Sequence, residues 1–430
     1  MIKPPLAQTN SMGSEGLNLP LIRRRPLYKV LNRTLRILHE AGLMKPPLET
    51  EPLIAAARRR ARLDDFGDEA FREPLRRLLE SYEREARLNS IGKLALKEDI
   101  LQLLVNRLEI QRDRRQLPLI SQEAIVAPIF ILGLPRTGTT LLHALLAQDH
   151  EAFSAPTTWE VMFPSPPPSL GRKGRIKRAE RRLLGFHLLA PDFQKIHPVS
   201  ALLPQECITI MSYTFMSDQF AAMYYVPTYE SWLKRQDMRP VYEFHRQFLQ
   251  HLQYGRPARR FVLKAPAHMP SVEALFATYP DALVVQTHRE PLEILPSAAS
   301  LTTALRSVFS DFVDPAAIGT EMTRHWEEAL DRFVAARQRL SPDAFFNVEY
   351  SDLIRNPIGV IRRLYGRLAR DLSSEVELRM RAFLSAHPTG KHGNHSYTLA
   401  VFGMDPVKLR KRFSSYRTYW GNLTVENARR

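Results

Sequence analysis

The chain has 430 residues, 44% of them hydrophobic and 25% charged, so it can bury a large core and is not intrinsically disordered. Its 61 Lys and Arg residues outnumber 45 Asp and Glu residues, and the net charge of +16 indicates an anionic ligand or surface as a partner. The single cysteine excludes an intramolecular disulfide and a cysteine-based zinc site, and it favours the cytoplasm. Because neither a signal peptide nor roughly 18 consecutive apolar residues are present, we expect no membrane-spanning anchor.

The first part of the chain predicts an all-helical region over residues 1–125. Residues 1–25 look irregular, and apolar residues then recur at helical spacing over 27–43, 51–62, 71–88 and 90–107. We expect this extension to pack against the rest of the chain or to cover a bound substrate.

The next segment predicts a strand, a phosphate-binding loop and a helix. An apolar run over 127–132 leads into a loop from Gly133 to Gly138, and apolar residues at helical spacing follow over 141–146. Loop N–H groups and the helix N-terminus therefore point at one anion. The two glycines have the spacing of the nucleotide triphosphatase loop, but Thr139 stands where that loop has its lysine. Without that lysine, the loop suits a phosphate held by hydrogen bonds and the charge of Arg136, with no metal.

Several features follow between the loop and the second strong strand. Trp159 and Glu160 are candidates for a substrate pocket, although a packed tryptophan is an equally open interpretation. The basic segment 171–182 indicates contact with acidic lipid headgroups or an anionic substrate, or simply a solvated helix face. No groove-reading motif is present, so we expect no nucleic-acid partner.

Four predicted strands alternate with helices: 128–132, 261–264, 283–287 and 344–349. This order predicts an α/β fold of the P-loop type, with a parallel sheet covered by helices on both faces. We expect one domain over residues 126–430, with a helical insertion at about 195–258. The phosphate loop, Lys264 and Arg289 each follow a strand, so they should meet at one edge of the sheet.

These motifs resemble the sulfotransferases that use 3′-phosphoadenosine 5′-phosphosulfate (PAPS). The loop of that family is matched by six consecutive residues: Pro135, Arg136, Thr137, Gly138, Thr139 and Thr140. Arg289 and Ser297, eight residues apart, fit the pair that holds the 3′-phosphate in the family. Tyr350 matches a tyrosine that lies near the adenine of the nucleotide in this family, so the resemblance implies the same place for Tyr350. Finally, Lys391, His392 and Gly393 resemble the loop that closes over the 3′-phosphate in the family. Beyond them, the apolar spacing predicts an amphipathic helix over residues 407–419, with Leu409, Phe413 and Tyr416 on one side, and we expect it to hold this loop in place.

The resemblance implies transfer of a sulfuryl group from PAPS to a hydroxyl of a small-molecule acceptor. Arg136 and Lys264 would stabilise the leaving phosphate, and no metal is expected. His268, 21 residues before Arg289, is our choice of general base, and Glu206 is the rival. The structural alternatives are a loop histidine that precedes a helix and a carboxylate in a first helical turn.

The sequence departs from the cytosolic branch at Leu141, where relatives carry a tryptophan that stacks on adenine. Met and aromatic residues over 211–225 favour an apolar acceptor, although such residues also make ordinary core. A kinase-like phosphotransferase and a non-catalytic nucleotide-binding protein remain alternatives, and the oligomeric state stays open. Contact with a membrane surface, without a membrane-spanning segment, is compatible with the charge.

Overall fold

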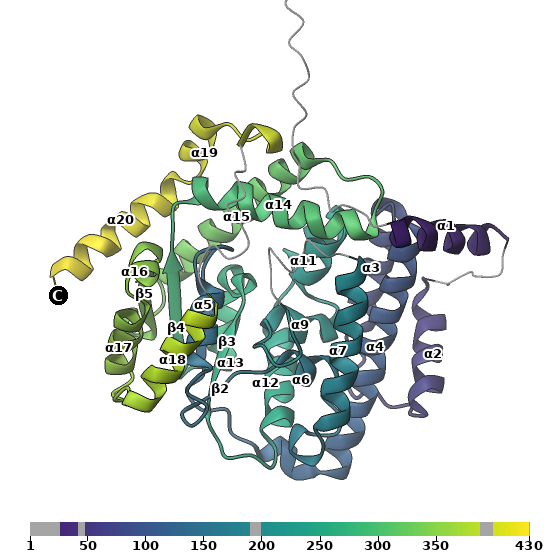
Figure 1. Cartoon of the computed structure of the whole chain (residues 1–430), viewed down its shortest axis with the longest axis horizontal. Helices are drawn as coiled ribbons and strands as arrows, with labels where there is room; N and C mark the ends of the chain where they lie inside the picture. Colours follow the sequence, from purple (N-terminus) through teal and green to yellow (C-terminus); the bar gives the residue numbers. More distant parts are fainter. Residues whose placement is uncertain (1–25, 42–47, 190–198, 388–398, 430) are drawn as a thin grey trace, which may run out of the picture.

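A five-stranded parallel sheet forms the centre of the molecule in a computed structural model, which describes residues 26–41, 48–189, 199–387 and 399–429 (Figure 1). The strands are β1 (Ile129–Leu132), β2 (Phe153–Ser154), β3 (Arg260–Lys264), β4 (Leu283–His288) and β5 (Phe345–Glu349). Their order is β2-β3-β1-β4-β5, and all neighbouring pairs run parallel. The predicted fold class is confirmed. The sequence missed only β2, because two residues carry no readable pattern.

Most of the remaining described residues are helical. The α-helices are α1 (Pro26–Glu40), α2 (Thr50–Ala61), α3 (Arg72–Glu85), α4 (Ser90–Gln116), α5 (Thr139–Leu146), α6 (Thr158–Met162), α7 (Lys173–Leu189), α9 (Cys207–Met211), α10 (Asp218–Met223), α11 (Pro227–Leu233), α12 (Arg239–Gln253), α13 (Val272–Thr278), α14 (Pro291–Phe309), α15 (Pro315–Arg337), α16 (Tyr350–Arg355), α17 (Pro357–Arg367), α18 (Ser374–Ala386), α19 (Pro406–Arg412) and α20 (Ser414–Arg429). Within the described ranges, none of them is long and apolar enough to cross a bilayer.

Helices cover both faces of the sheet, because every residue of β1 is buried and successive side chains point to opposite sides. Phe130 and Leu132 pack in a core that includes residues of α12, α13 and α15. Ile129 and Ile131 pack in a second core with residues of α5, α17 and α18. After β1, the next two strands in the chain, β2 and β3, lie on one side of β1. The last two strands, β4 and β5, lie on its other side. Strand order therefore reverses between β1 and β4, which is where parallel sheets open a ligand-binding crevice.

The N-terminal helices share a core with the region before α12 and with the end of α14. Leu78 of α3 and Leu104 of α4 belong to one cluster with Phe215, Tyr229 and Phe309. The N-terminal helices thus pack against the sheet domain through a common core. The domain boundary at residue 125 stays a prediction.

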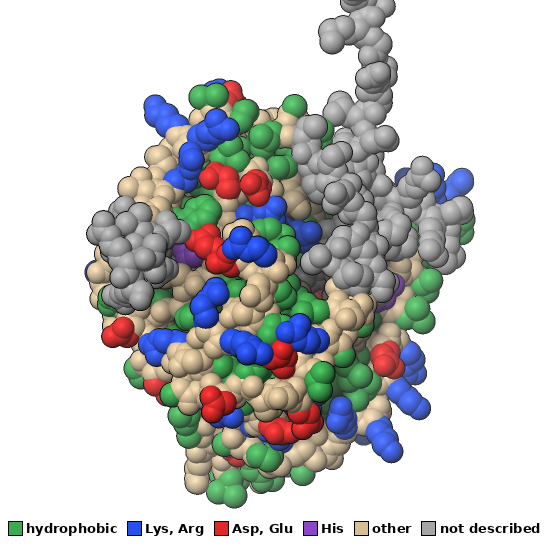
Figure 2. Space-filling view, turned by 60° about the vertical axis from the view of Figure 1, so that its left-hand side comes forward, with side chains coloured by type: hydrophobic (Ala, Val, Ile, Leu, Met, Phe, Trp, Pro, Cys, Tyr) green, Lys and Arg blue, Asp and Glu red, His purple; other side chains and the backbone are tan. Residues whose placement is uncertain are grey.

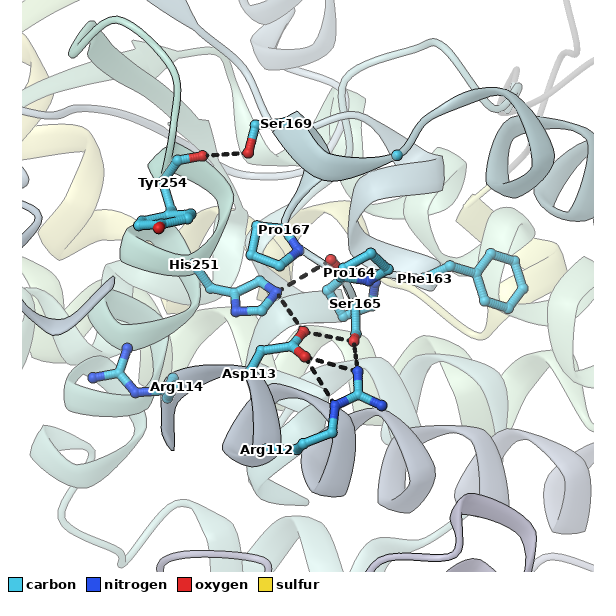
Figure 3. Close-up of polar contacts among 12 residues, drawn as sticks. Arg112, Asp113, Arg114, Phe163, Pro164, Ser165, Pro167, Ser169, His251 and Tyr254 are labelled. Atoms are coloured by element: carbon cyan, nitrogen blue, oxygen red, sulfur yellow. Dashed lines mark hydrogen bonds and ion pairs between the residues drawn. The ribbon is translucent and has the colours of Figure 1, made fainter. Parts of the chain in front are cut away.

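A buried polar cluster fastens the segment after α6 between α4 and α12 (Figure 3). Ser165 donates a hydrogen bond of 2.6 Å to Asp113, whose other oxygen lies 2.7 Å from the guanidinium of Arg112. The imidazole Nε2 of His251 lies 3.2 Å from the carbonyl oxygen of Pro164. Asp113 and His251 are buried in this cluster, so leaving either of them without a partner would be costly.

The C-terminal segment forms two helices instead of the single amphipathic helix predicted over residues 407–419. The break lies at Phe413, the C-cap of α19, which has a non-helical backbone conformation. The predicted apolar side holds, because Leu409, Phe413 and Tyr416 are all buried. The closing loop that this helix was expected to hold lies outside the described residues.

The surface agrees with the excess of basic residues. On the face in Figure 2, Lys and Arg side chains are spread widely, and acidic side chains lie between them. Such a mixture of signs is typical of a soluble protein surface and does not by itself locate a site.

Buried histidines make the fold sensitive to acid. Burial lowers the pKa of His245 to about 3 and those of His143, His251 and His288 to about 4. These pKa values lie below the unfolded value of about 6.5, so the unfolded chain binds more protons between the two values. The contribution of these histidines to the free energy of unfolding is therefore fully present above pH about 6.5 and is lost as the pH falls toward about 4.

We expect the melting temperature, measured by circular dichroism at constant ionic strength, to fall between pH about 7 and about 5, because the unfolded histidines take up protons in this range. A melting temperature that stays constant over this range would contradict the role given to the buried histidines.

Candidate active site

The loop between β1 and α5 makes close contacts that require glycine. Gly138 has a φ of 85°, and a Cβ atom there would lie 2.7 Å from Leu353. A Cβ atom on Gly133 would lie 2.2 Å from the hydroxyl of Thr287. Thr137 also points inward: its hydroxyl donates to the carbonyl of Leu134 at 2.6 Å and lies 2.6 Å from that of Thr287. Thr137 therefore fixes the shape of the loop.

The outer side of the same loop can hold an anion. Helix α5 begins at Thr139, and its N-cap, Gly138, has no side chain to accept hydrogen bonds from the first-turn N–H groups. Arg136 and Thr140 are exposed beside them. Unsatisfied N–H groups, the positive end of the helix and a guanidinium favour a phosphate at this point.

A lysine from the neighbouring strand adds a second cation to that of Arg136 and replaces the lysine that the loop lacks at position 139. Lys264 ends β3, where its backbone lies opposite Ile131 of β1. Its Nζ lies 3.3 Å from the hydroxyl of Thr140 and forms an ion pair with Glu206. The lysine side chain is only 4% exposed, so its charge is held in one place and is weakly screened. The cation thus reaches the phosphate loop from β3, not from the loop position that Thr139 occupies.

Glu206 is positioned by hydrogen bonds of the segment that precedes it. The N–H of Gln205 donates to the carbonyl of Pro156 at 2.8 Å, and that of Thr158 donates to Leu203 at 3.0 Å. Glu206 is the N-cap residue of α9, yet its side chain makes no capping hydrogen bond. Its carboxylate instead reaches Lys264, and the side chain is 18% exposed. A partly accessible carboxylate therefore lies beside the phosphate loop.

On the other side of the loop, Arg289 brings three predicted elements together. Its guanidinium donates to the carbonyl of Arg136 and to Glu293, both at 3.0 Å. It also lies 4.1 Å from the ring centre of Tyr350, a cation–π distance. Tyr350 in turn comes within 3.4 Å of the place where a Cβ atom on Gly138 would stand. Ser297 follows on α14 and is partly exposed.

The structure places His268 away from this cluster. His268 is fully buried, its Nδ1 lies 2.8 Å from the hydroxyl of Tyr242, and its ring meets Phe130 edge-on. Its Nε2 has no hydrogen-bond partner among the described residues. Burial holds its pKa well below the usual value, with His245 adding to the shift. His268 is thus enclosed by packed side chains, and this placement favours the structural interpretation of the residue over the base.

His288, next to Arg289 in the chain, also lies inward. Its ring nitrogens lie 3.0 Å from the hydroxyl of Tyr416 and from the amide oxygen of Asn347. Its ring stacks on Trp420. It therefore anchors the C-terminal helix α20 against the end of β4.

Trp159 and Glu160 also take structural positions. The Glu160 carboxylate accepts from the N–H of Thr157 at 2.8 Å, which closes a capping box at the start of α6, and it pairs with Arg256 at 2.7 Å. Trp159 is 1% exposed and lies under the guanidinium of Arg175. Both placements favour the packing interpretation over a substrate contact.

Three other findings complete the comparison with the sequence. Lys391, His392 and Gly393 lie outside the described residues. Thr287 and Glu293 were missed: the first supports the phosphate loop and the second holds Arg289. Thr287 could have been found as a polar residue near the end of an otherwise apolar strand. A cavity of about 450 Å³ between α11, α13 and α15 includes none of the predicted site residues.

Comparison with known proteins identifies the family. The model of the "Sulfotransferase family" matches residues 128–374, from β1 to the start of α18. The chain belongs to the sulfotransferase family. The sulfotransferase is 33% identical to sulfotransferase STF1 from Mycobacterium tuberculosis, with a TM-score of 0.76 over 85% of this chain and 98% of that one. It resembles STF9 from Mycobacterium avium at 26% identity and a TM-score of 0.75, over 86% of this chain and 95% of that one.

One relative has a named acceptor. The sulfotransferase is 27% identical over 300 residues to the omega-hydroxy-beta-dihydromenaquinone-9 sulfotransferase Stf3 of Mycobacterium tuberculosis, which covers 65% of this chain and 72% of the relative. The same enzyme from Mycobacterium bovis matches equally well. Family, fold and relatives agree that the chain is a sulfotransferase, so the cluster around the loop is its candidate active site.

The glycine at the end of the loop offers a direct test. In Gly138→Ala the new Cβ atom would meet Leu353 in a backbone conformation that disfavours alanine. We expect the dissociation constant for 3′,5′-bisphosphoadenosine, measured by calorimetry, to rise at least about fivefold. Gly366→Ala is the matched control, because nothing lies within 4 Å of a Cβ atom there. Equal affinities of the two variants would contradict the role given to the loop.

Proposed function

We propose that the enzyme transfers the sulfuryl group of PAPS to a hydroxyl of an apolar, lipid-like acceptor. The observation that carries the proposal is Lys264, which contacts both Thr140 of the phosphate loop and the carboxylate of Glu206. Lys264 would therefore lie between the leaving phosphate, held by the loop, and the base, Glu206. The lipid-like acceptor is supported by the relative Stf3, which is named for a menaquinone derivative with a hydroxyl group.

The residues around the loop fit a nucleotide with phosphates at both ends. The loop from Pro135 to Thr140 would hold the 5′-phosphosulfate. Arg289 and Ser297 would hold the 3′-phosphate, and Tyr350 would lie near the adenine. The guanidinium of Arg289 suits a phosphate because it offers several fixed donors, two of which already hold Arg136 and Glu293. The closing role of Lys391, His392 and Gly393 stays a prediction.

In the proposed reaction, the acceptor oxygen forms a bond to sulfur while the bond from sulfur to the bridging phosphate oxygen breaks. The acceptor proton passes to the carboxylate of Glu206. Lys264 and Arg136 stabilise the negative charge on the departing phosphate. Arg136 does so by charge and hydrogen bonds alone, since a guanidinium does not lose its proton, whereas the ammonium of Lys264 can donate one. PAPS supplies the activated sulfuryl group.

We assign the base to Glu206, not to His268, because the two residues differ in access. Glu206 is partly exposed beside the loop, and His268 is fully buried behind Phe130. A base must come within hydrogen-bonding reach of the hydroxyl it deprotonates.

Phosphoryl transfer is not favoured for this site. A kinase of this fold uses a loop lysine with magnesium held by acidic residues, whereas here β4 ends at His288 and is followed by Arg289. We therefore propose that transfer continues in the presence of a chelator. A cytoplasmic location and the lack of a nucleic-acid partner also stay predictions.

Replacing the proposed base should separate catalysis from binding. For Glu206→Gln we expect kcat to fall roughly a hundredfold or more, because the amide cannot accept the proton. The affinity for 3′,5′-bisphosphoadenosine should change much less. Glu273→Gln is the control, since Glu273 lies on α13 and forms an exposed ion pair with Arg339. Full activity of Glu206→Gln would rule out this base, and the melting temperature checks that both variants fold.

The proposed 3′-phosphate contact is tested by a ratio of affinities. We expect Arg289→Ala to lose about tenfold or more of the preference for 3′,5′-bisphosphoadenosine over adenosine 5′-phosphate, because a charge-assisted hydrogen bond is removed. Arg289 also supports the loop through Arg136, so a purely structural role would weaken both ligands equally. An unchanged ratio in calorimetry would therefore refute the assignment.

A further inference from the structure

Exposed apolar side chains gather around the C-terminal end of α14. We call this region the α14-end surface and define it by seven residues: Val30, Leu31 and Ile37 of α1, Leu184 and Leu188 of α7, Tyr225 before α11, and Phe312 after α14. Each of them is among the large apolar residues that remain exposed; Val30 is 62% and Phe312 is 69% exposed. Gathered exposed apolar residues mark interaction sites more often than scattered ones do.

Contacts beneath this surface show that its parts are neighbours. The hydroxyl of Tyr28 in α1 donates to the carbonyl of Val308 at 2.7 Å. Phe186 of α7 stacks on Phe309 at 6.5 Å between ring centres, and Tyr224 lies 5.2 Å from the same ring. Three separate segments thus meet at the last turn of α14, and Figure 1 shows α1 beside this end of the helix. An exposed apolar residue follows each of these contacts within three residues: Val30 after Tyr28, Leu188 after Phe186, Tyr225 after Tyr224 and Phe312 after Phe309.

Basic residues continue the apolar stripe along α7. Lys177, Arg181, Leu184 and Leu188 are spaced by four, three and four residues, so they share one face of the helix. All four are exposed. Among the described residues, neither Lys177 nor Arg181 has an ion-pair partner. The helix therefore presents a face with charge at one end and leucines at the other.

Three other arginines of α7 do make packing contacts with neighbouring helices. Arg182 pairs with Asp99, Arg178 lies 4.2 Å from the ring centre of Phe163, and Arg175 donates to the carbonyl of Phe163 at 3.0 Å. These side chains fasten the helix to α4 and α6. Among the described residues no contact of this kind is found for Lys177 or Arg181, which line a pocket together with Leu184 and residues 199–202.

Helix α1 has the same combination of exposed groups. Lys29 and Arg33 are exposed between its apolar residues, and Arg36 lies 3.9 Å from Glu40. Arg87 covers the ring of Phe312 at 5.4 Å. Glu40, Glu180 and Asp311 of the same segments are fewer than the described basic residues, which are Lys29, Arg33, Arg36, Arg87, Lys177 and Arg181. The surface is apolar at its centre and has a net positive rim.

We propose that the α14-end surface docks the enzyme on an anionic lipid bilayer. Leucine, isoleucine and aromatic side chains would enter the boundary between headgroups and acyl chains, while the basic rim contacts lipid phosphates. A second copy of the chain suits this surface less well. In a two-fold dimer the surface would meet itself and bring its basic residues together.

The surface is separate from the candidate active site. Helix α14 begins two residues after Arg289 and ends at Phe309, so its 19 residues span about 27 Å at the usual rise per residue. Docking is therefore inferred without any assumption about the acceptor. An acceptor that is not a lipid would leave the docking proposal unchanged. Failure to dock on a bilayer would likewise leave the proposed acceptor unchanged.

Vesicle binding tests the proposal with a matched pair of variants. The full-length protein is sedimented with vesicles of phosphatidylcholine alone, and with vesicles of phosphatidylcholine and phosphatidylglycerol in equal amounts. We expect binding to the anionic vesicles only. The double variant Arg181→Glu with Leu184→Ser should lower the partition coefficient at least about tenfold, because it reverses a charge and removes an inserted side chain.

The control variant Arg370→Glu with Leu378→Ser makes the same chemical changes at exposed residues after α17 and on α18. It should bind vesicles as the unaltered protein does. Both variants should keep their melting temperature and their affinity for 3′,5′-bisphosphoadenosine. Equal loss of vesicle binding in both would reduce the effect to net charge and overturn the proposal. So would a change in molar mass by light scattering in the Arg181 variant alone, which would show an interface between copies.

Discussion

The ion pair between Lys264 and Glu206 is the interaction on which the site depends. It joins the end of β3 to the start of α9, and Lys264 also contacts Thr140 at the start of α5. Removing a lysine that is only 4% exposed from its partner would leave a poorly solvated charge, so the pair constrains the segment before α9 as well as the loop. The same pair places a cation beside the phosphate loop and a carboxylate beside the cation. The same ion pair therefore contributes both to the local fold and to the proposed reaction.

The parallel sheet makes this contact possible. Lys264 and Ile131 lie opposite each other in neighbouring strands, so the side chain that ends β3 reaches the loop that follows β1. On the other side, β4 delivers Arg289 to the carbonyl of Arg136. The sheet therefore provides two cations from two strands on either side of one glycine-rich loop. The helices that share a core with α14 extend the molecule away from this edge, toward the α14-end surface.

Local patterns were enough to predict the sheet and the loop, because buried strands and glycine turns leave signals within a few residues. Arg289 and Tyr350 were found through resemblance; the structure places Tyr350 beside Gly138, and Arg289 contacts the Tyr350 ring and the carbonyl of Arg136. The choice between His268 and Glu206 needed the fold, since burial depends on residues far away in the chain, such as Tyr242 and Phe130. The positions of Trp159 and Glu160 likewise depend on partners in α7 and before β3, which no local pattern shows. The missed Thr287 contacts Thr137, which lies 150 residues away in the chain, so no local pattern shows its role.

The most direct test of the account is the rate of sulfuryl transfer by Lys264→Met, with PAPS as donor, a hydroxylated quinol lipid as acceptor and a chelator present. If Lys264 takes the part of the lysine that the loop lacks at position 139, kcat should fall roughly a hundredfold or more while the affinity for 3′,5′-bisphosphoadenosine falls much less. Transfer by the variant at the rate of the unaltered enzyme would contradict the central claim, because the leaving phosphate would then be stabilised without the lysine of β3.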